Sequence, residues 1–319
     1  MKAIVCMKYG PPDVLQFKEV AKPSPKDNEV LIRIHAASVN QADLHFLRGK
    51  PFPIRLIGFA LLQPKHKILG ADIAGRVEAV GSAVRQFKPG DEVFGDIFAS
   101  GFGGFAEYVC AREDALTLKP AGLTFEQAAA VPMAALTALQ GLRDKGQIQS
   151  RQNVLINGAS GGVGTFAVQI AKSFGAEVTG VCSTGKSDMV RSIGADHVID
   201  YTQEDFAKNG QEYDLILAAN GNRSVSEYKR ALSRKGRCVV TGGSDAQVFQ
   251  AMLLGGKRVR TIISRPNQND MVFIKGLLEA EKVKPIIDRC YTLDQVADAF
   301  RYLEEGHARG KIIINLEPQ

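Results

Sequence analysis

The sequence has 319 residues, of which 45% are hydrophobic and 23% charged, and its formal net charge is +6. This length allows about two globular domains, and the hydrophobic content is ordinary for a folded protein with real cores. No apolar run reaches the roughly 18 residues that span a bilayer, and no basic block is long enough to form a nucleic-acid-binding arm. We therefore expect neither a membrane span nor a nucleic-acid partner.

The cysteines and the first residues indicate the compartment. The five cysteines lie far apart, so none has the spacing of a zinc knuckle or of a redox Cys-x-x-Cys. An odd, scattered set is typical of a reducing compartment. The start, MKAIVCMKYG, lacks the pattern of a signal peptide and is interpreted as a strand. We therefore expect a cytoplasmic protein.

The first part of the chain is rich in strand signals. Val30, Ile32 and Ile34 alternate with other residues, and a Pro-Gly-Asp turn at 89–91 separates two further strand-like runs. The remaining strands are expected at 73–81, 91–98, 103–111 and 116–120. The segment 48–69 mixes proline, basic and apolar residues, and we expect a long loop there that forms a cleft wall or a partner contact.

The pattern changes at Thr124. Residues 123–142 predict one helix, with Thr124 as its cap and Gln127 as the capping-box partner. Strands and helices then alternate, which is typical of a parallel sheet with crossover helices. The strands are expected at 153–158, 177–182, 197–201, 214–219 and 237–243, and the helices at 163–175, 187–194 and 224–232. Two helices at 271–283 and 291–306 and a strand at 311–316 end the chain.

A glycine-rich stretch, NGASGGVG, lies between the first of these strands and its helix. Gly158, Gly161 and Gly164 permit a tight turn, close approach of a ligand and close packing of the helix on the strand. The helix N-terminus then offers free N–H groups to a pyrophosphate. We interpret the stretch as a dinucleotide site, with a purely structural turn as the alternative. No Gly-Lys-Ser/Thr follows, so it is not a P-loop.

The end of the second strand indicates which dinucleotide binds. An NAD site usually has an acid there for the ribose 2′-hydroxyl. Here Ser183, Thr184 and Lys186 occupy the region, and no acid appears before Asp188. This favours a 2′-phosphate and hence NADP(H), unless Lys186 is an ordinary solvated lysine.

These motifs resemble the medium-chain dehydrogenase/reductase superfamily, and in particular its quinone oxidoreductase, zeta-crystallin-like branch. AVGSAVRQFKPGDEVFG, FGGFAEYV, AAAVPMAALTAL, GASGGVG, GADHVIDY and HARGKIII match that family in order. The resemblance implies an α/β protein with a GroES-like, β-rich catalytic domain at 1–123 and 264–319 and a doubly wound Rossmann domain at 124–263. It also implies a homodimer, which would form through the edge strand of the Rossmann domain at 237–243 or through its neighbour at 259–264.

The resemblance also implies a set of cofactor-binding residues. Thr137 would approach the nicotinamide, or else only bond its own helix backbone. Tyr201 would lie near the 2′-phosphate or merely pack at a strand end, and Lys311 would close the far side or be a surface charge. At 218–221, where relatives commonly have an Asp-Ala-Val-Gly-like stretch, this chain has Ala-Ala-Asn-Gly. The remaining members are Ser160, Gly161, Gly162, Val163, Ser183, Thr184, Lys186, Asn220, Gly242 and Gly243.

Zinc-dependent relatives carry a cysteine and a Gly-His-Glu where this chain has Asn40 and Gly70-Ala71-Asp72. Asp72 alone cannot hold a catalytic zinc, which needs three protein ligands. The resemblance therefore implies a zinc-free enzyme with no metal site. Without a Lewis acid, the remaining chemistry is hydride delivery from NADPH to quinones or α,β-unsaturated carbonyls.

Asn40, Asp43 and His45 match polar cleft positions of the relatives and are the candidate catalytic residues. Asn40 would bond a substrate carbonyl, and His45 would orient the substrate or supply a proton. Alternatively, Asn40 and Asp43 are only a helix N-cap and its partner acid. Two other functions stay open: an enoyl-thioester reductase, and a cofactor-binding protein without catalysis, as in the crystallins.

Overall fold

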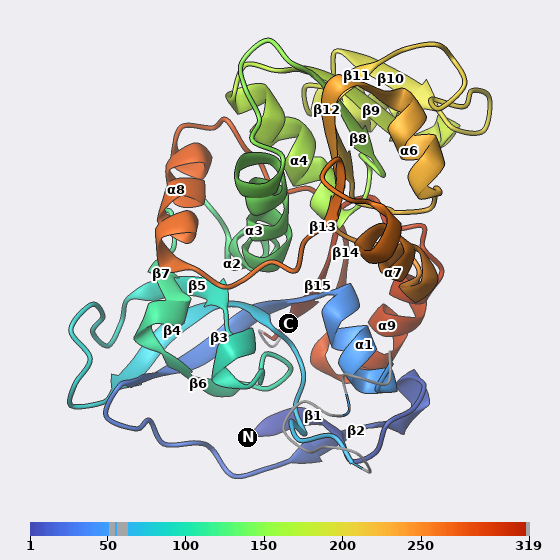
Figure 1. Cartoon of the computed structure of the whole chain (residues 1–319). Helices are drawn as coiled ribbons and strands as arrows, with labels where there is room; N and C mark the ends of the chain where they lie inside the picture. Colours follow the sequence, from blue (N-terminus) through green and yellow to red (C-terminus); the bar gives the residue numbers. More distant parts are fainter. Residues whose placement is uncertain (51–54, 56–62, 317–319) are drawn as a thin grey trace. The chain divides into compact units, whose positions relative to one another are not determined.

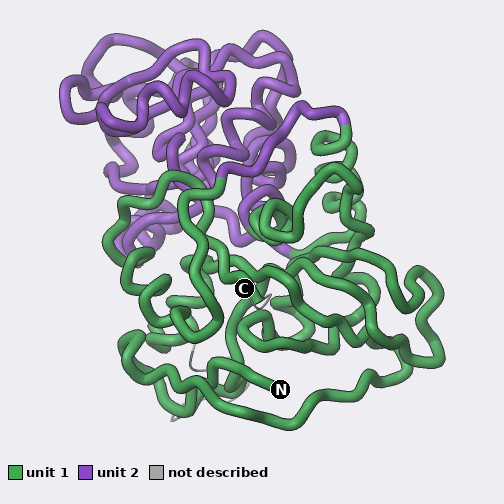
Figure 2. The backbone as a smooth tube through the Cα atoms, turned by 180° about the vertical axis from the view of Figure 1, so that it is seen from behind, with its two compact units in different colours: residues 1–133, 266–279, 287–319 green, residues 134–265, 280–286 purple. Residues whose placement is uncertain are grey.

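The computed structural model describes residues 1–50, 55 and 63–316, and these divide into two compact units (Figure 2). Unit 1 contains residues 1–133, 266–279 and 287–319. Unit 2 contains residues 134–265 and 280–286. The chain therefore completes most of one unit, builds the other, and returns to the first for its last strands.

Unit 1 is built on a mainly antiparallel sheet (Figure 1). Alternating apolar residues of its strands form one core with Ile32, Ile73, Val93 and Phe105 among the buried members. Among the strand pairs of this sheet in the described residues, β14–β15 is parallel and the others are antiparallel. In spatial order the strands are β14 (Ile287–Thr292), β15 (Lys311–Asn315), β3 (Glu29–Val39), β4 (Asp72–Val80), β5 (Glu92–Asp96) and β7 (Leu116–Leu118). The strand β6 (Tyr108–Arg112) also pairs with β3. A separate two-stranded sheet consists of β1 (Lys2–Cys6) and β2 (Leu15–Glu19).

The register of this sheet brings distant segments together. Ser38 of β3 faces Asp72 at the start of β4, and Val39 faces Ile312 of β15. The helix α1 (Gln41–Arg48) begins directly after β3. The sheet therefore places residues 40, 72 and 311 at one corner, although they are far apart in the sequence.

The helix predicted over 123–142 is two helices. The capping box of Thr124 and Gln127 is confirmed: the Gln127 N–H donates to Thr124 Oγ1 over 3.2 Å, and the Thr124 N–H donates to Gln127 Oε1 over 3.0 Å. However, α2 (Phe125–Ala129) ends before Pro132, and α3 (Pro132–Gln140) begins there. The prediction of one helix was wrong because proline has no N–H to continue the ladder and is favoured at a helix start.

Unit 2 contains a six-stranded parallel sheet, which confirms the predicted Rossmann fold. Along the sheet the order is β10 (His197–Asp200), β9 (Glu177–Cys182), β8 (Asn153–Asn157), β11 (Tyr213–Ala218), β12 (Leu232–Val240) and β13 (Val259–Thr261). The helices between its strands are α4 (Gly162–Ser173), α5 (Ser187–Ser192), α6 (Val225–Ala231) and α7 (Asp245–Leu254). The direction of winding reverses between β8 and β11, and ligands of doubly wound sheets bind at such a point.

Several local expectations need correction. Of the two strands suggested for the dimer edge, 237–243 corresponds to β12, which lies between β11 and β13, whereas 259–264 contains β13, which is the edge. The helix expected from residue 291 starts later, since Tyr291 and Thr292 end β14 and α9 (Val296–Glu304) follows a short 3-10 turn. The strands β2 and β14 and the helix α7 carry no periodic pattern that predicted them.

The helix expected at 271–283 corresponds to α8 (Gln268–Glu279), which belongs to unit 1. Most of the loop predicted at 48–69 lies outside the described residues. Among the helices of the described ranges, none has both the length and the apolar character needed to cross a bilayer.

Candidate functional site

The glycine stretch forms the turn between β8 and α4, as predicted. Gly158 has a φ of +87°, and a Cβ there would lie 2.9 Å from the Cβ of Asn220. A Cβ on Gly164 would lie 2.0 Å from the carbonyl oxygen of Gly158. Neither position tolerates a side chain without a shift, because real Cβ atoms do not approach other atoms so closely. The turn therefore requires glycine at both positions.

The N-terminus of α4 has the features of an anion site. Gly161 is the N-cap, and it has no side chain that could satisfy the first helical N–H groups. Those N–H groups, from Gly162 and Val163 onward, have no acceptor within the helix. Ser160 adds a buried hydroxyl-bearing side chain beside them. This donor set fits the pyrophosphate of a dinucleotide, since it offers N–H groups and the positive end of the helix dipole.

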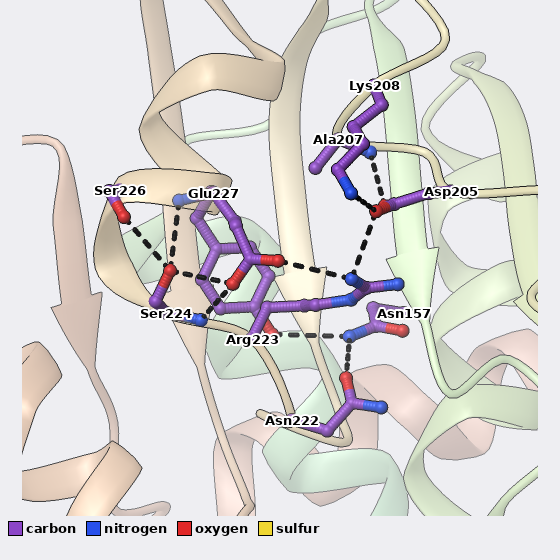
Figure 3. A network of polar contacts seen from close by, with 10 residues as sticks. Asn157, Asp205, Ala207, Lys208, Asn222, Arg223, Ser224, Ser226 and Glu227 are labelled. Carbon is purple, nitrogen blue, oxygen red and sulfur yellow. Dashed lines mark hydrogen bonds and ion pairs between the residues drawn. The ribbon is translucent and has the colours of Figure 1, made fainter.

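A network around Asn157 holds the neighbouring loop (Figure 3). The Asn157 amide nitrogen lies 2.7 Å from the Asn220 carbonyl oxygen, 3.0 Å from Asn222 Oδ1 and 3.2 Å from Tyr228 Oη. Arg223 pairs with Asp205 at 3.2 Å and with Glu227 at 3.1 Å. The chain after β11 is therefore held from both sides, and no local pattern marks Asn157 for this role.

The end of β12 completes this corner of unit 2. The Gly221 N–H donates to the Gly242 carbonyl over 2.8 Å, and a Cβ on Gly221 would lie 2.3 Å from the same oxygen. Gly243 has a φ of +136°. The structure thus brings three predicted cofactor residues, Asn220, Gly242 and Gly243, to the carboxyl ends of adjacent strands.

The end of β9 carries the residues predicted to select the cofactor. Ser183 precedes a 3-10 turn of Thr184–Lys186, and the Tyr201 N–H donates to the Cys182 carbonyl over 3.0 Å. The ring-bearing side chain of Tyr201 is 54% exposed. The structure therefore groups Ser183, Thr184, Lys186 and Tyr201 at one end of two neighbouring strands.

An acid that the sequence argument missed also lies at this end. Asp200 ends β10, and its carboxylate accepts hydrogen bonds from the hydroxyl of Thr184 and from the N–H of Thr202. Both bonds lower the pKa of Asp200, and the bond from Thr184 has the larger effect. No linear signal marks Asp200, because it approaches Thr184 only through the pairing of β9 with β10.

Thr137 lies on α3, where its hydroxyl donates to Ser264 Oγ over 2.9 Å. On the same helix, the side chain of Gln140 bonds the backbone of Arg265 in both directions, with its Nε2 donating over 2.9 Å and its Oε1 accepting over 3.0 Å. The chain after β13 is therefore held against α3 within unit 2.

A second polar cluster lies in unit 1, at the corner formed by β3, β4 and β15. Lys311 is only 3% exposed, and its ammonium donates to Asn40 Oδ1 over 2.5 Å and lies 3.4 Å from Asp72 Oδ2. The same Asp72 oxygen accepts from Asn40 Nδ2 over 3.0 Å and from the Ser38 hydroxyl over 2.9 Å. The Met133 N–H donates to Asp72 Oδ1 over 2.9 Å. Asp72 is thus the centre of the cluster, a role that the sequence argument did not assign.

Two further buried carboxyl groups are influenced by this cluster. Asp43 accepts from the N–H of Asn40 over 2.9 Å and from that of Gly70 over 3.2 Å, which agrees with the predicted helix-capping alternative. Burial raises the pKa of Asp43 to about 7, and the charge of Asp72 adds to the increase. Burial raises the pKa of Asp96 to about 8, again with a contribution from Asp72. Lys311 opposes both increases.

His45, the third catalytic candidate, has a partner outside this polar cluster. His45 Nδ1 lies 3.0 Å from the carbonyl oxygen of Lys50, so Nδ1 carries the proton and donates. This bond closes the end of α1. Across residues 1–50, 55 and 63–316, no three His, Cys, Asp or Glu side chains are grouped so that they could hold a metal ion.

Comparison with protein families matches both parts of the chain. Residues 26–121 match the model described as the alcohol dehydrogenase GroES-like domain. Residues 193–314 match the model described as zinc-binding dehydrogenase.

Individual relatives match over the whole length. The chain is 38% identical to the 2-methylene-furan-3-one reductase of Solanum lycopersicum, covering 100% of this chain and 80% of that protein. It is 35% identical to the chloroplastic NADPH-dependent alkenal/one oxidoreductase of Arabidopsis thaliana, covering 98% and 79%. Among solved structures, the quinone oxidoreductase from Coxiella burnetii superposes with a TM-score of 0.87 at 31% identity, covering 99% of each chain. The chain therefore belongs to the medium-chain dehydrogenase/reductase family, in its quinone oxidoreductase-like branch.

Proposed function

We propose that the protein is an NADPH-dependent reductase that transfers hydride to quinones or α,β-unsaturated carbonyl compounds. The observation that carries the proposal is the corner of unit 2 where β8, β11 and β12 end, because its glycines let the neighbouring loops pack closely beside the N-terminus of α4, whose first N–H groups can bind an anion. The relatives named above support it, since their names describe an enone reductase, an alkenal/one oxidoreductase and a quinone oxidoreductase.

We assign the cofactor to residues of unit 2. The N–H groups at Gly161, Gly162 and Val163, with Ser160, would hold the pyrophosphate. Ser183, Thr184, Lys186 and Tyr201 would surround the 2′-phosphate, and Thr137, Asn220, Gly242 and Gly243 would lie toward the nicotinamide half. NADPH would supply the hydride when bound. Lys311 was also predicted to touch the cofactor, and that prediction stays open, but its observed contacts are those of the Asn40 cluster.

The acceptor is assigned to Asn40. An amide N–H there would bond the carbonyl oxygen of a quinone or enone and so stabilise the negative charge that develops on it during hydride transfer. Asp43 holds the backbone of Asn40 in place. His45 remains the candidate proton donor: in its imidazolium form it would release a proton from Nε2, because Nδ1 keeps its proton in the bond to the Lys50 carbonyl.

We further propose that the reaction needs no zinc. Asn40 and Ala71 replace the cysteine and histidine of the zinc-dependent relatives, and Asp72 is engaged by Ser38, Asn40 and Lys311. Conjugated acceptors are already electrophilic, so no Lewis acid is required to activate them. The cytoplasmic location also stays a prediction, since relatives are named as chloroplastic and as mitochondrial.

The decisive experiment is a screen of NADPH and NADH oxidation against quinones, enones, enoyl thioesters and simple ketones, with and without a strong chelator. We expect chelator-resistant turnover with quinones or enones and no oxidation of simple alcohols. Preferred turnover of enoyl thioesters would instead identify an enoyl-thioester reductase. No turnover with any acceptor would indicate a cofactor-binding protein without catalysis.

A homodimer is proposed on separate grounds. The edge strand β13 is followed by Ile263, which is 90% exposed, and the neighbouring α7 exposes Phe249, Met252, Leu253 and Leu254. A sheet edge with adjacent apolar surface favours pairing with another strand. We therefore expect two copies to associate through this edge of unit 2.

A further inference from the structure

The Asn40 side chain is held between two opposite charges. Its Oδ1 accepts from the Lys311 ammonium over 2.5 Å, and its Nδ2 donates to Asp72 Oδ2 over 3.0 Å. An ammonium can only donate and a carboxylate can only accept. The reversed amide would place its NH2 against the ammonium and its oxygen against the carboxylate, so only one orientation satisfies both neighbours.

We propose that Lys311 is a positioning residue, which with Asp72 locks the Asn40 amide so that it acts on the acceptor only as a hydrogen-bond donor. The proposal rests on the proposed function, because it takes Asn40 to be the residue that bonds the acceptor. It adds a basis for specificity: a locked donor selects substrates that present a carbonyl oxygen and gives no acceptor to a hydroxyl group.

The contacts of Nδ2 leave donor capacity for such a role. One N–H of the amide points to Asp72, and the nearest acceptor for the other is the Ser38 carbonyl oxygen at 3.5 Å, the limit for a hydrogen bond. A hydrogen bond from a cation to the amide oxygen also polarises the amide and strengthens its N–H groups as donors. Burial maintains this effect, because Asn40 is 8% exposed and Lys311 is 3% exposed.

The competing explanation is that Lys311 only neutralises Asp72, which is fully buried. Removing the cation that pairs with a buried carboxylate strongly destabilises the folded protein. A loss of activity in Lys311→Met alone would therefore not separate the two explanations. The double variant Lys311→Met/Asp72→Asn does separate them. It removes both charges and hence the unpaired carboxylate, yet it leaves the Asn40 oxygen without its ammonium.

The experiment compares kcat/KM for a quinone or enone, the Kd of NADPH from its fluorescence, and Tm. The matched control is Lys119→Met, because the Lys119 side chain is only 4% exposed and forms an ion pair in unit 1, at 3.1 Å from Glu92, but its partners among the described residues do not include Asn40. We expect Lys311→Met to lose about 10- to 100-fold in kcat/KM, the loss typical of a charge-assisted hydrogen bond, with an unchanged NADPH Kd. Lys119→Met should lower Tm without this loss.

The double variant should regain Tm relative to Lys311→Met and remain slow. Recovery of wild-type kcat/KM in the double variant would overturn the proposal, since charge neutralisation would then be the whole role. A weakened NADPH Kd with normal acceptor turnover in Lys311→Met would also overturn it and would make Lys311 a cofactor residue.

A direct measurement covers the case in which the variants do not fold. In wild-type protein with 15N-labelled asparagine, the Asn40 side-chain resonances can be assigned by comparison with Asn40→Ser. The proposal expects the side-chain N–H groups of Asn40 to exchange slowly with solvent, whereas exchange as fast as that of exposed asparagines would reject it. This readout does not use turnover, so it distinguishes failure of the lock from failure of the proposed reductase activity.

Discussion

The side-chain amide of Asn157 donates to the backbone carbonyl of Asn220 over 2.7 Å and so ties the end of β8 to the end of β11. This contact lies where the winding of the parallel sheet reverses. It also keeps Asn220 against Gly158, whose positive φ and missing side chain make that approach possible. The shape of the candidate cofactor site thus depends on a polar contact between two loops.

Replacing Asn157 by alanine should therefore weaken both stability and cofactor binding. The change leaves the buried Tyr228 hydroxyl and the Asn220 carbonyl without this donor, and the loss of a partner for a buried polar group costs about 1–3 kcal/mol. We expect a lower Tm and an NADPH Kd raised about tenfold or more. Asn209→Ala is the control, because it removes a surface amide bonded to Glu204. An Asn157→Ala protein with wild-type Kd would contradict the role of this contact.

The glycine turn can be tested with two alanine substitutions. Gly164→Ala places a Cβ 2.0 Å from the Gly158 carbonyl oxygen, so the strand and helix must separate, and we expect a loss of about 1–3 kcal/mol in unfolding free energy or more. Gly161→Ala meets that oxygen only at 3.6 Å, an ordinary contact, and should keep the stability of the wild type. Chemical denaturation of both variants gives the comparison, and equal stability of the two would argue against the close packing of α4 on β8.

Cofactor selection is tested at Lys186. The loss of one charge-assisted contact to a phosphate should weaken NADPH binding about 10- to 100-fold and leave NADH almost unaffected. Lys172→Ala is the control, since that lysine pairs with Asp196 at 2.7 Å on the surface of the same unit. If titrations of Lys186→Ala show equal weakening of both cofactors, Lys186 does not contact the 2′-phosphate.

The stability of the protein should fall as the pH rises toward 8. In the folded protein the pKa of Asp96 is raised to about 8, whereas in the unfolded chain it is near its ordinary value of 3.8. Between these values the folded state binds more protons, so the free energy of unfolding decreases with rising pH. Asp43, whose pKa is raised to about 7, contributes in the same direction.

The variant Asp96→Asn should reduce the dependence of the unfolding free energy on pH, because an asparagine side chain does not titrate. Its side-chain oxygen can still accept the hydrogen bond from the Phe98 N–H, which Asp96 accepts over 2.9 Å. Urea denaturation at several pH values from about 5 to about 8.5 measures the slope. Asp114→Asn, which removes an exposed carboxyl paired with Arg112, should leave the slope unchanged. A variant at position 96 with the wild-type slope would mean that Asp96 does not carry this proton.

The proposed dimer should be disrupted at the edge of unit 2. Light scattering of the wild type should give about twice the chain mass of 34.5 kDa, and Ile263→Lys should shift the protein toward the monomer because it places a charge beside β13. Val272→Lys, at another exposed aliphatic position, is the control. A wild-type protein that is monomeric at all concentrations tested would reject the dimer.

Much of the fold could be predicted from sequence because its signals are local. The alternation of strands and helices after Thr124, the glycine turn at 157–164 and the capping box of Thr124 and Gln127 each involve residues a few positions apart, so their patterns can be read along the chain. The order of the sheet could not be read in this way. The strand at the edge of the parallel sheet is β13 and not β12, because the order of parallel strands depends on how the crossover helices pack.

The candidate catalytic cluster shows the same division. Asn40 and Asp43 could be identified because they follow one strand directly and match the pattern of a capped helix. Their partners Asp72 and Lys311 lie 32 and 271 positions away from Asn40. Pairing of β3 with both β4 and β15 brings them together, and burial then strengthens the electrostatic interactions between their charges. The order of residues shows which polar groups are present, but it does not show which of them meet in the folded protein, because strand register is set by packing over the whole sheet.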